Sequence, residues 1–73
     1  MVSVIIPALN EETSLEAALS SVQAAEGNAE VIVVDGESTD ATPADAARYA
    51  RVVSSPPGRA LQMNRGAAAA HAN

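Results

Sequence analysis

Acidic and amide side chains follow the two most apolar stretches of the sequence. The run Val31–Val34 leads directly into Asp35 and Gly36. The run Val2–Ile6 is followed by the segment Pro7-Ala8-Leu9-Asn10-Glu11-Glu12, which places one amide and two acids after it. A carboxylate accepts two hydrogen bonds at once, so an acid at a strand end suits the hydroxyls of a ribose or a base N–H.

Each of these acids also has a purely structural interpretation. Asp-Gly is a common turn pair, so Asp35 could simply tighten a turn. Glu11 and Glu12 could be ordinary negative charges near the start of a helix, where the helix dipole favours them. Ser38, Thr39 and Asp40 are better explained as loop and cap residues than as ligands.

Among the basic residues, Arg59 is the strongest candidate for binding an anion. It lies at the expected start of a helix, where a cation opposes the dipole and gains nothing structural. Arg48 and Arg65 are expected to be solvated, and His71 to be a surface or helix-end residue. The residues alone leave Gln62 and Asn64 open.

Three strands are expected to position these side chains. Val2–Ile6 should be stopped by Pro7, and Val31–Val34 by Asp35-Gly36, while Arg51–Ser55 forms a weaker third strand. Continuous apolar runs, as opposed to alternating ones, are typical of a parallel sheet covered by helices on both faces.

Three helices are expected between and after the strands. Thr13–Glu16 has the pattern of a capping box, and a stripe of Leu15, Ala18, Leu19 and Val22 follows it. Thr42 and Pro43 repeat the start signal for a helix to about Ala50. The segment 58–73 predicts a third helix with one side formed by Ala60, Met63, Ala67 and Ala70.

The fold class is therefore α/β, with a three-stranded parallel β-α-β-α-β-α unit. The carboxyl ends of parallel strands meet at one edge of the sheet, where such folds bind ligands. Residues 7–12, 35–40 and 54–59 should line this rim.

Composition excludes several functions. The chain of 73 residues carries a net charge of −5, with four arginines and no lysine, which argues against a general nucleic-acid binder. It has no cysteine, a single histidine, and no apolar run long enough to span a membrane. Neither G-x-G-x-x-G nor a Walker motif is present, so a dinucleotide is not expected. A cytoplasmic location is expected, with the inner face of a membrane as an alternative for a longer parent protein.

Three blocks, VSVIIPALNEE, EVIVVDGESTDAT and GRALQMNRG, resemble the amino-terminal part of a family 2 glycosyltransferase of the GT-A fold. The resemblance covers nearly the whole chain. It implies the nucleotide-binding half of a Rossmann-type sheet, which grips the uridine, guanosine or thymidine diphosphate of a sugar donor. The residues expected around the nucleotide are Pro7, Ala8, Asn10, Glu11, Glu12, Asp35, Gly36, Arg59 and Asn64.

Two departures from the family pattern stand out. The common second block is D-D-G-S-T-D, whereas here the second acid is Gly36 and the glycine is Glu37. Metal-dependent members also hold Mg²⁺ or Mn²⁺ through a D-x-D pair after a fourth strand and use a later acid as general base. Neither lies in this chain, so residues 1–73 are expected to be a partial domain of an inverting transferase, inactive alone.

A different class of function stays open beside the enzyme. The chain could be a non-catalytic α/β module that binds a nucleotide or assembles through the exposed edge of its third strand. The nucleotide, the sugar, the acceptor and the oligomeric state are not readable from these residues.

Overall fold

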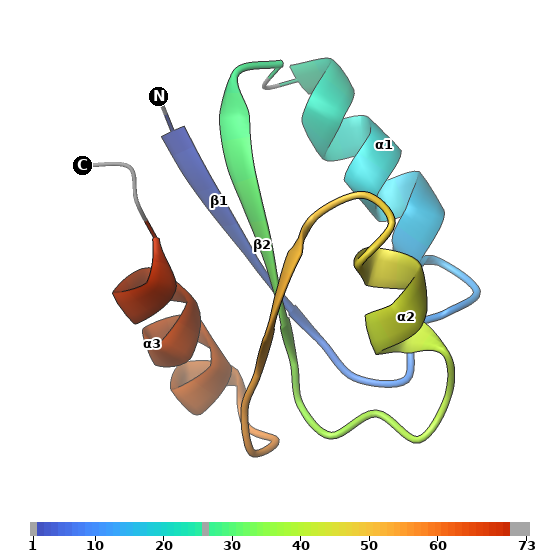
Figure 1. The fold of residues 1–73 in the computed structure, drawn as a ribbon, viewed down its shortest axis with the longest axis vertical. Helices are drawn as coiled ribbons and strands as arrows, with labels where there is room; N and C mark the ends of the chain where they lie inside the picture. Colours follow the sequence, from blue (N-terminus) through green and yellow to red (C-terminus); the bar gives the residue numbers. More distant parts are fainter. Residues whose placement is uncertain (1, 26, 71–73) are drawn as a thin grey trace.

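The computed structural model describes residues 2–25 and 27–70, and Figure 1 shows them as one sheet between helices. The predicted assignment of His71 lies outside these residues. The elements in chain order are β1 (Val2–Ala8), α1 (Leu15–Ala25), β2 (Ala29–Asp35), α2 (Thr42–Ala46), β3 (Arg51–Ser54) and α3 (Arg59–Ala69). The predicted β-α-β-α-β-α order is confirmed.

All three strands are parallel, in the order β1-β2-β3. The register aligns their carboxyl ends, because Ala8 lies opposite Asp35 and Asp35 lies opposite Ser54. β1 and β3 both lie at an edge, so the exposed edge expected at the third strand has a counterpart at the first. The predicted rim is therefore a real feature of the fold.

Helices cover both faces of the sheet, with α1 and α2 on one face and α3 on the other (Figure 1). Leu15, Leu19 and Ala46 pack with Val33 in a buried cluster on the first face. The opposite face of β2 includes Val34, which lies close to α3. This two-sided burial explains why the central strand is a continuous apolar run.

Pro7 does not end the first strand as predicted, since β1 runs on to Ala8. In a parallel ladder, successive residues direct their backbone groups to alternate sides. Ala8 directs its carbonyl at β2, where it accepts from the N–H of Gly36 at 2.9 Å. The nitrogen of Pro7 therefore faces the open edge, where no donor is needed.

The start of α1 differs from the predicted capping box. The backbone N–H groups of Ser14 and Leu15 both donate to the carbonyl of Glu11, and the helix begins at Leu15. Within residues 2–25 no hydrogen bond joins Thr13 to Glu16, so the box was wrong. The predicted stripe is only half right: Leu15 and Leu19 are buried, whereas Ala18 is exposed and Val22 is half-buried.

The second helix is shorter than predicted, because α2 ends at Ala46. The chain then tightens into turns, in which Arg48 and Tyr49 donate to carbonyls three residues earlier. Thr42 does not cap this helix. It is fully buried, and the helix start has no side-chain cap.

The third helix ends at Ala69, and its packed face was predicted wrongly. The residues it buries are Gln62 and Gly66, whereas Ala60 and Ala67 are exposed and Met63 is half-buried. Hydrophobicity alone gives a face displaced by about one position here, because the closest contacts to the sheet are made by an amide and a glycine. No helix in the described part of the chain has the length and apolar character to cross a membrane.

Candidate functional site

A shallow pocket of about 180 Å³ opens at the carboxyl rim, between the end of β1 and the start of α3. Its lining consists of Pro7, Ala8, Leu9, Glu11, Arg59 and Gln62. Four of the nine residues expected around a nucleotide therefore converge on one depression, although Arg59 lies about fifty positions along the chain from the others.

Arg59 contributes the positive charge of this pocket. It is the first residue of α3, after Gly58, whose φ of 139° turns the chain into the helix. The helix start has no side-chain cap. Across residues 2–25 and 27–70 the Arg59 guanidinium makes neither a hydrogen bond nor an ion pair, so its donors are available to a ligand.

The loops that follow β1 and β2 are tied together through Asn10. Its Oδ1 accepts from the backbone N–H of Thr39 at 2.8 Å and from the Thr39 hydroxyl at 3.3 Å, while its own N–H donates to Ser38 Oγ at 2.9 Å. Asn10 has a φ of 51°, a left-handed conformation that asparagine tolerates better than most residues. The loop after β1, which contributes Leu9 and Glu11 to the pocket lining, is therefore fixed to the loop after β2 without a bound ligand.

A second set of bonds joins the same two loops. Thr42 Oγ1 accepts from the backbone N–H of Glu11 at 2.8 Å and donates to Asp40. Asp40 also accepts from the N–H groups of Thr42, at 2.9 Å, and of Glu12, at 3.3 Å. These bonds, led by the one from the Thr42 side chain, lower the pKa of Asp40 below its ordinary value. The side chains of Asp40 and Thr42 therefore hold the two loops together.

Asp35 is the last residue of β2, and it is only 6% exposed. Both of its carboxylate oxygens accept hydrogen bonds from Ser38, one from the backbone N–H at 3.1 Å and one from the hydroxyl. This is the turn role that Asp-Gly sequences favour. Contact between Asp35 and a nucleotide base stays a prediction.

Gln62 is the residue of this site that the sequence left undecided. It is 5% exposed, and it bonds to three separate backbone segments. Its Nε2 donates to the carbonyls of Ala8 at 3.1 Å and Val34 at 2.9 Å, and its Oε1 accepts from the N–H of Gly58 at 3.1 Å. A single glutamine in a helix does not by itself predict a buried amide with three backbone partners. Its position four residues after Gly58 is the one sequence feature that indicates a bond to the start of the helix.

One half of the departure from D-D-G-S-T-D, the glycine at position 36, has a physical explanation. A Cβ at Gly36 would lie 2.9 Å from Cδ and Nε2 of Gln62, closer than real Cβ contacts, so a side chain cannot be placed there without displacing the glutamine. Glu37, where the family pattern has glycine, adopts a φ of 66°. That left-handed conformation suits glycine and strains a glutamate.

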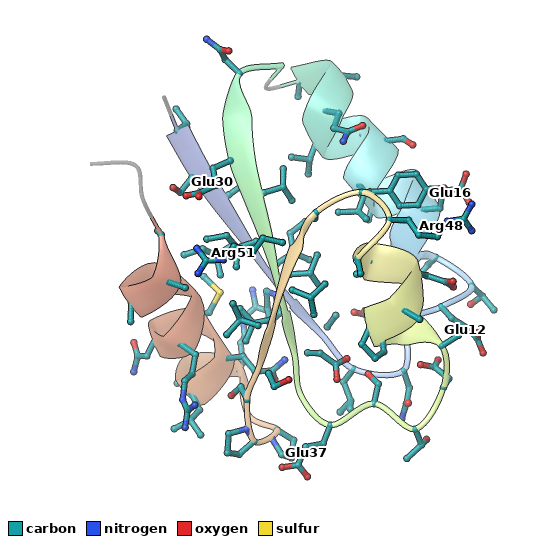
Figure 2. All side chains as sticks on the ribbon, viewed as in Figure 1. Glu12, Glu16, Glu30, Glu37, Arg48 and Arg51 are labelled. Carbon is teal, nitrogen blue, oxygen red and sulfur yellow. The ribbon has the colours of Figure 1, made fainter. Side chains whose placement is uncertain are left out.

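Five of the nine predicted residues are not in the pocket lining: Asn10, Asp35 and Gly36, described above, and Glu12 and Asn64. Glu12 lines a separate hollow of about 90 Å³ together with Glu16 and Arg48. Figure 2 places these three side chains beside α1 and α2. Asn64 is exposed on α3 and is not among the lining residues. A role for either in nucleotide binding stays a prediction.

The described residues do not fit a divalent metal. Residues 2–25 and 27–70 contain no group of three His, Cys, Asp or Glu side chains that could hold one. The one Asp-x-acid pair in the region of the site, Asp35 and Glu37, is split between a buried carboxylate bonded to Ser38 and an exposed residue at the rim (Figure 2).

Comparison with known families agrees with the α/β fold. The family model described as glycosyl transferase family 2 matches residues 3–73. Searches of curated proteins and of solved structures each returned no match. The parallel sheet alternating with helices is consistent with the amino-terminal, Rossmann-like half of the GT-A fold. Since the match spans nearly the whole chain, the protein belongs to glycosyltransferase family 2.

Proposed function

We propose that this chain binds the nucleotide of a nucleotide-diphosphate sugar at the pocket between β1 and α3. In a complete protein, the sugar would pass to an acceptor hydroxyl with inversion. The acceptor hydroxyl gives its proton to a general base and its oxygen bonds to the anomeric carbon, while the bond from that carbon to the diphosphate oxygen breaks and the diphosphate leaves with the electron pair. Residues other than those described would bind the acceptor and any divalent metal and would supply the general base.

One observation supports the proposal above the others: the pocket combines an unengaged guanidinium with a carboxylate at the rim of a parallel sheet. Guanidinium groups pair with the oxygens of a diphosphate through charge-assisted hydrogen bonds. Glu11 supplies an acceptor suited to ribose hydroxyls. Pro7, Ala8 and Leu9 form the apolar wall of the pocket, against which a base would pack.

The size of the pocket indicates how much of the donor this chain would hold. Ligand sites for drug-sized molecules occupy roughly 300–1,000 Å³, whereas this pocket offers about 180 Å³. It accommodates part of a nucleotide and leaves the sugar outside. We therefore expect weak binding of the nucleotide diphosphate and no sugar transfer by the chain alone.

The test is a ¹⁵N-resolved NMR titration of the folded chain with uridine, guanosine and thymidine diphosphates, repeated on Arg59→Ala. Loss of a charge-assisted bond at an open site should weaken binding about tenfold. Arg65→Ala is the matched control, because Arg65 is an exposed arginine on the same helix that does not line the pocket. Equal affinity of the wild-type chain and both variants would contradict a nucleotide site at Arg59.

A further inference from the structure

Gln62 connects the three backbone segments that frame the pocket. Ala8 ends β1, Val34 lies near the end of β2, and Gly58 immediately precedes α3. The glutamine bonds to all three, with both protons of its Nε2 and with its Oε1. A buried amide that makes three bonds at once tolerates little displacement of any partner, because an unpaired buried polar group is costly.

These bonds lie directly behind the pocket wall. Ala8 lines the pocket on the sheet side, and Arg59, one residue after Gly58, lines it on the helix side. Gln62 itself contributes to the lining. Gln62 therefore fixes the distance between the end of β1 and the backbone at the start of α3, from which the Arg59 side chain extends.

Gly36 is shaped to receive this side chain. A Cβ at that position would come within 2.9 to 3.0 Å of Cδ, Nε2 and Oε1 of Gln62. The backbone N–H of Gly36 in turn donates to the same Ala8 carbonyl that accepts from Gln62. Gly36 and Gln62 thus act as a matched pair.

We propose that Gln62, seated against Gly36, is a positioning residue that sets Arg59 at the correct distance from the β1 wall for a nucleotide diphosphate. This inference rests on the proposed function of the pocket. Gln62 acts through Arg59, and it needs no contact with the nucleotide.

The variant Gln62→Glu keeps the shape of the side chain and replaces both amide donors with a carboxylate that faces two carbonyl oxygens. A guanidinium misplaced by about 1 Å loses much of its binding contribution, so we expect a loss of affinity for uridine diphosphate of up to about tenfold, the loss expected for Arg59→Ala. Gln23→Glu is the matched control, since it makes the same chemical change at an exposed position of α1. We expect no loss there.

A double-mutant cycle with Arg59→Ala distinguishes a positioning role of Gln62 from a general loss of structure. If Gln62 acts through Arg59, the double variant Arg59→Ala/Gln62→Glu binds uridine diphosphate no more weakly than Arg59→Ala alone. The Arg59 Nε–H resonance should also shift on addition of uridine diphosphate in the wild-type chain and not in Gln62→Glu. The methyl resonances of Leu19 and Val33 report that the core is intact.

Should Gln62→Glu fail to fold, Gln62→Met and Gly36→Ala take its place, because neither buries a charge. Both are expected to weaken binding, by up to about tenfold, while the core resonances persist. Full affinity in the folded Gln62 and Gly36 variants, beside a wild-type chain that binds, would overturn the positioning role alone. A wild-type chain that binds none of the three diphosphates would overturn the proposed function, and the positioning role with it.

Discussion

Replacing Gly66 by alanine is the sharpest test of how α3 packs on the sheet. Gly66 is buried in the middle of the helix. A Cβ at this position would lie 2.4 Å from Cγ2 of Ile5 and 2.9 Å from Cγ2 of Val34. The two atoms belong to neighbouring strands, β1 and β2, so the helix cannot avoid one contact by sliding toward the other.

The expected size of the effect follows from two opposing terms. Alanine in a helix interior is favoured over glycine by about 1 kcal/mol. Forcing an extra methyl into a packed interface costs about 1–3 kcal/mol, and two contacts below 3.0 Å place this site near the upper limit. The free energy of unfolding should therefore fall by about 2 kcal/mol, which lowers the Tm of a domain of this size by roughly 8–16 °C.

The assay is urea and thermal unfolding followed by circular dichroism. Gly27→Ala is the matched control, since the nearest atom to its Cβ would be the Gln23 backbone oxygen at an ordinary 3.8 Å. That variant should unfold within about 0.5 kcal/mol of the wild-type chain.

A double variant tests the cause of the loss. Ile5→Ala removes the Ile5 atoms that the new Cβ would meet at 2.4 and 3.3 Å, so Gly66→Ala should cost less in an Ile5→Ala background than alone. If Gly66→Ala is as stable as the wild-type chain, or if its cost is unchanged by Ile5→Ala, the close approach of α3 to the sheet is wrong.

Two further variants test the rim loops. Glu37→Gly removes the strain of a left-handed glutamate, roughly 1–2 kcal/mol, but the glycine adds conformational freedom to the unfolded state that costs roughly 0.5–1 kcal/mol. The free energy of unfolding in urea should therefore rise by about 0.5–1 kcal/mol. The control Glu16→Gly on α1 should lose about 1 kcal/mol, and a similar loss for Glu37→Gly would contradict the strain. The pKa of Asp40 is lower in the folded chain than in the unfolded one, so its contribution is present at neutral pH and is lost as the pH falls below about 3.8 and through the folded value. The stability difference between the wild-type chain and Asp40→Asn should accordingly shrink below that pH, and a difference that stays constant down to pH 2 would refute the role of the Thr42 bonds.

The order of the strands along the chain and their parallel direction could be predicted, because a strand buried on two faces is a continuous run of apolar residues. Val31–Val34 has no polar residue to interrupt it, and the structure buries Ile32, Val33 and Val34 completely. The parallel arrangement and the shared rim follow from the alternation of these runs with helical segments. Strand positions and their parallel direction depend on the average hydrophobicity of whole segments, so one unusual residue does not change the prediction.

The packed face of α3 could not be predicted from hydrophobicity, because its contacts depend on tertiary detail. Gln62 is buried since three backbone groups satisfy its amide, and no local pattern announces those partners. Gly66 is buried since its lack of a side chain lets the helix approach Ile5 and Val34. An ordinary helical pattern assigns both residues to the solvent side.

The rim loops illustrate the same limit. Asp35 and Asp40 were recognisable as polar residues at a ligand-binding edge, and Thr42 as a helix-start residue, but their partners were not. The structure bonds Asp35 to Ser38, and it bonds Thr42 to Asp40 and to the backbone of Glu11. Polar side chains at a rim can hold either a ligand or one another, and only the fold decides between them.

The central claim is that the pocket beside Arg59 holds the nucleotide, and chemical-shift mapping of the wild-type chain with uridine diphosphate tests it most directly. We predict that the largest shift changes fall on the backbone amides of Ala8, Leu9, Glu11 and Arg59, and that the hollow lined by Glu16 and Arg48 stays unchanged. Changes centred on that hollow, or no saturable change with any of the three diphosphates, would contradict the claim.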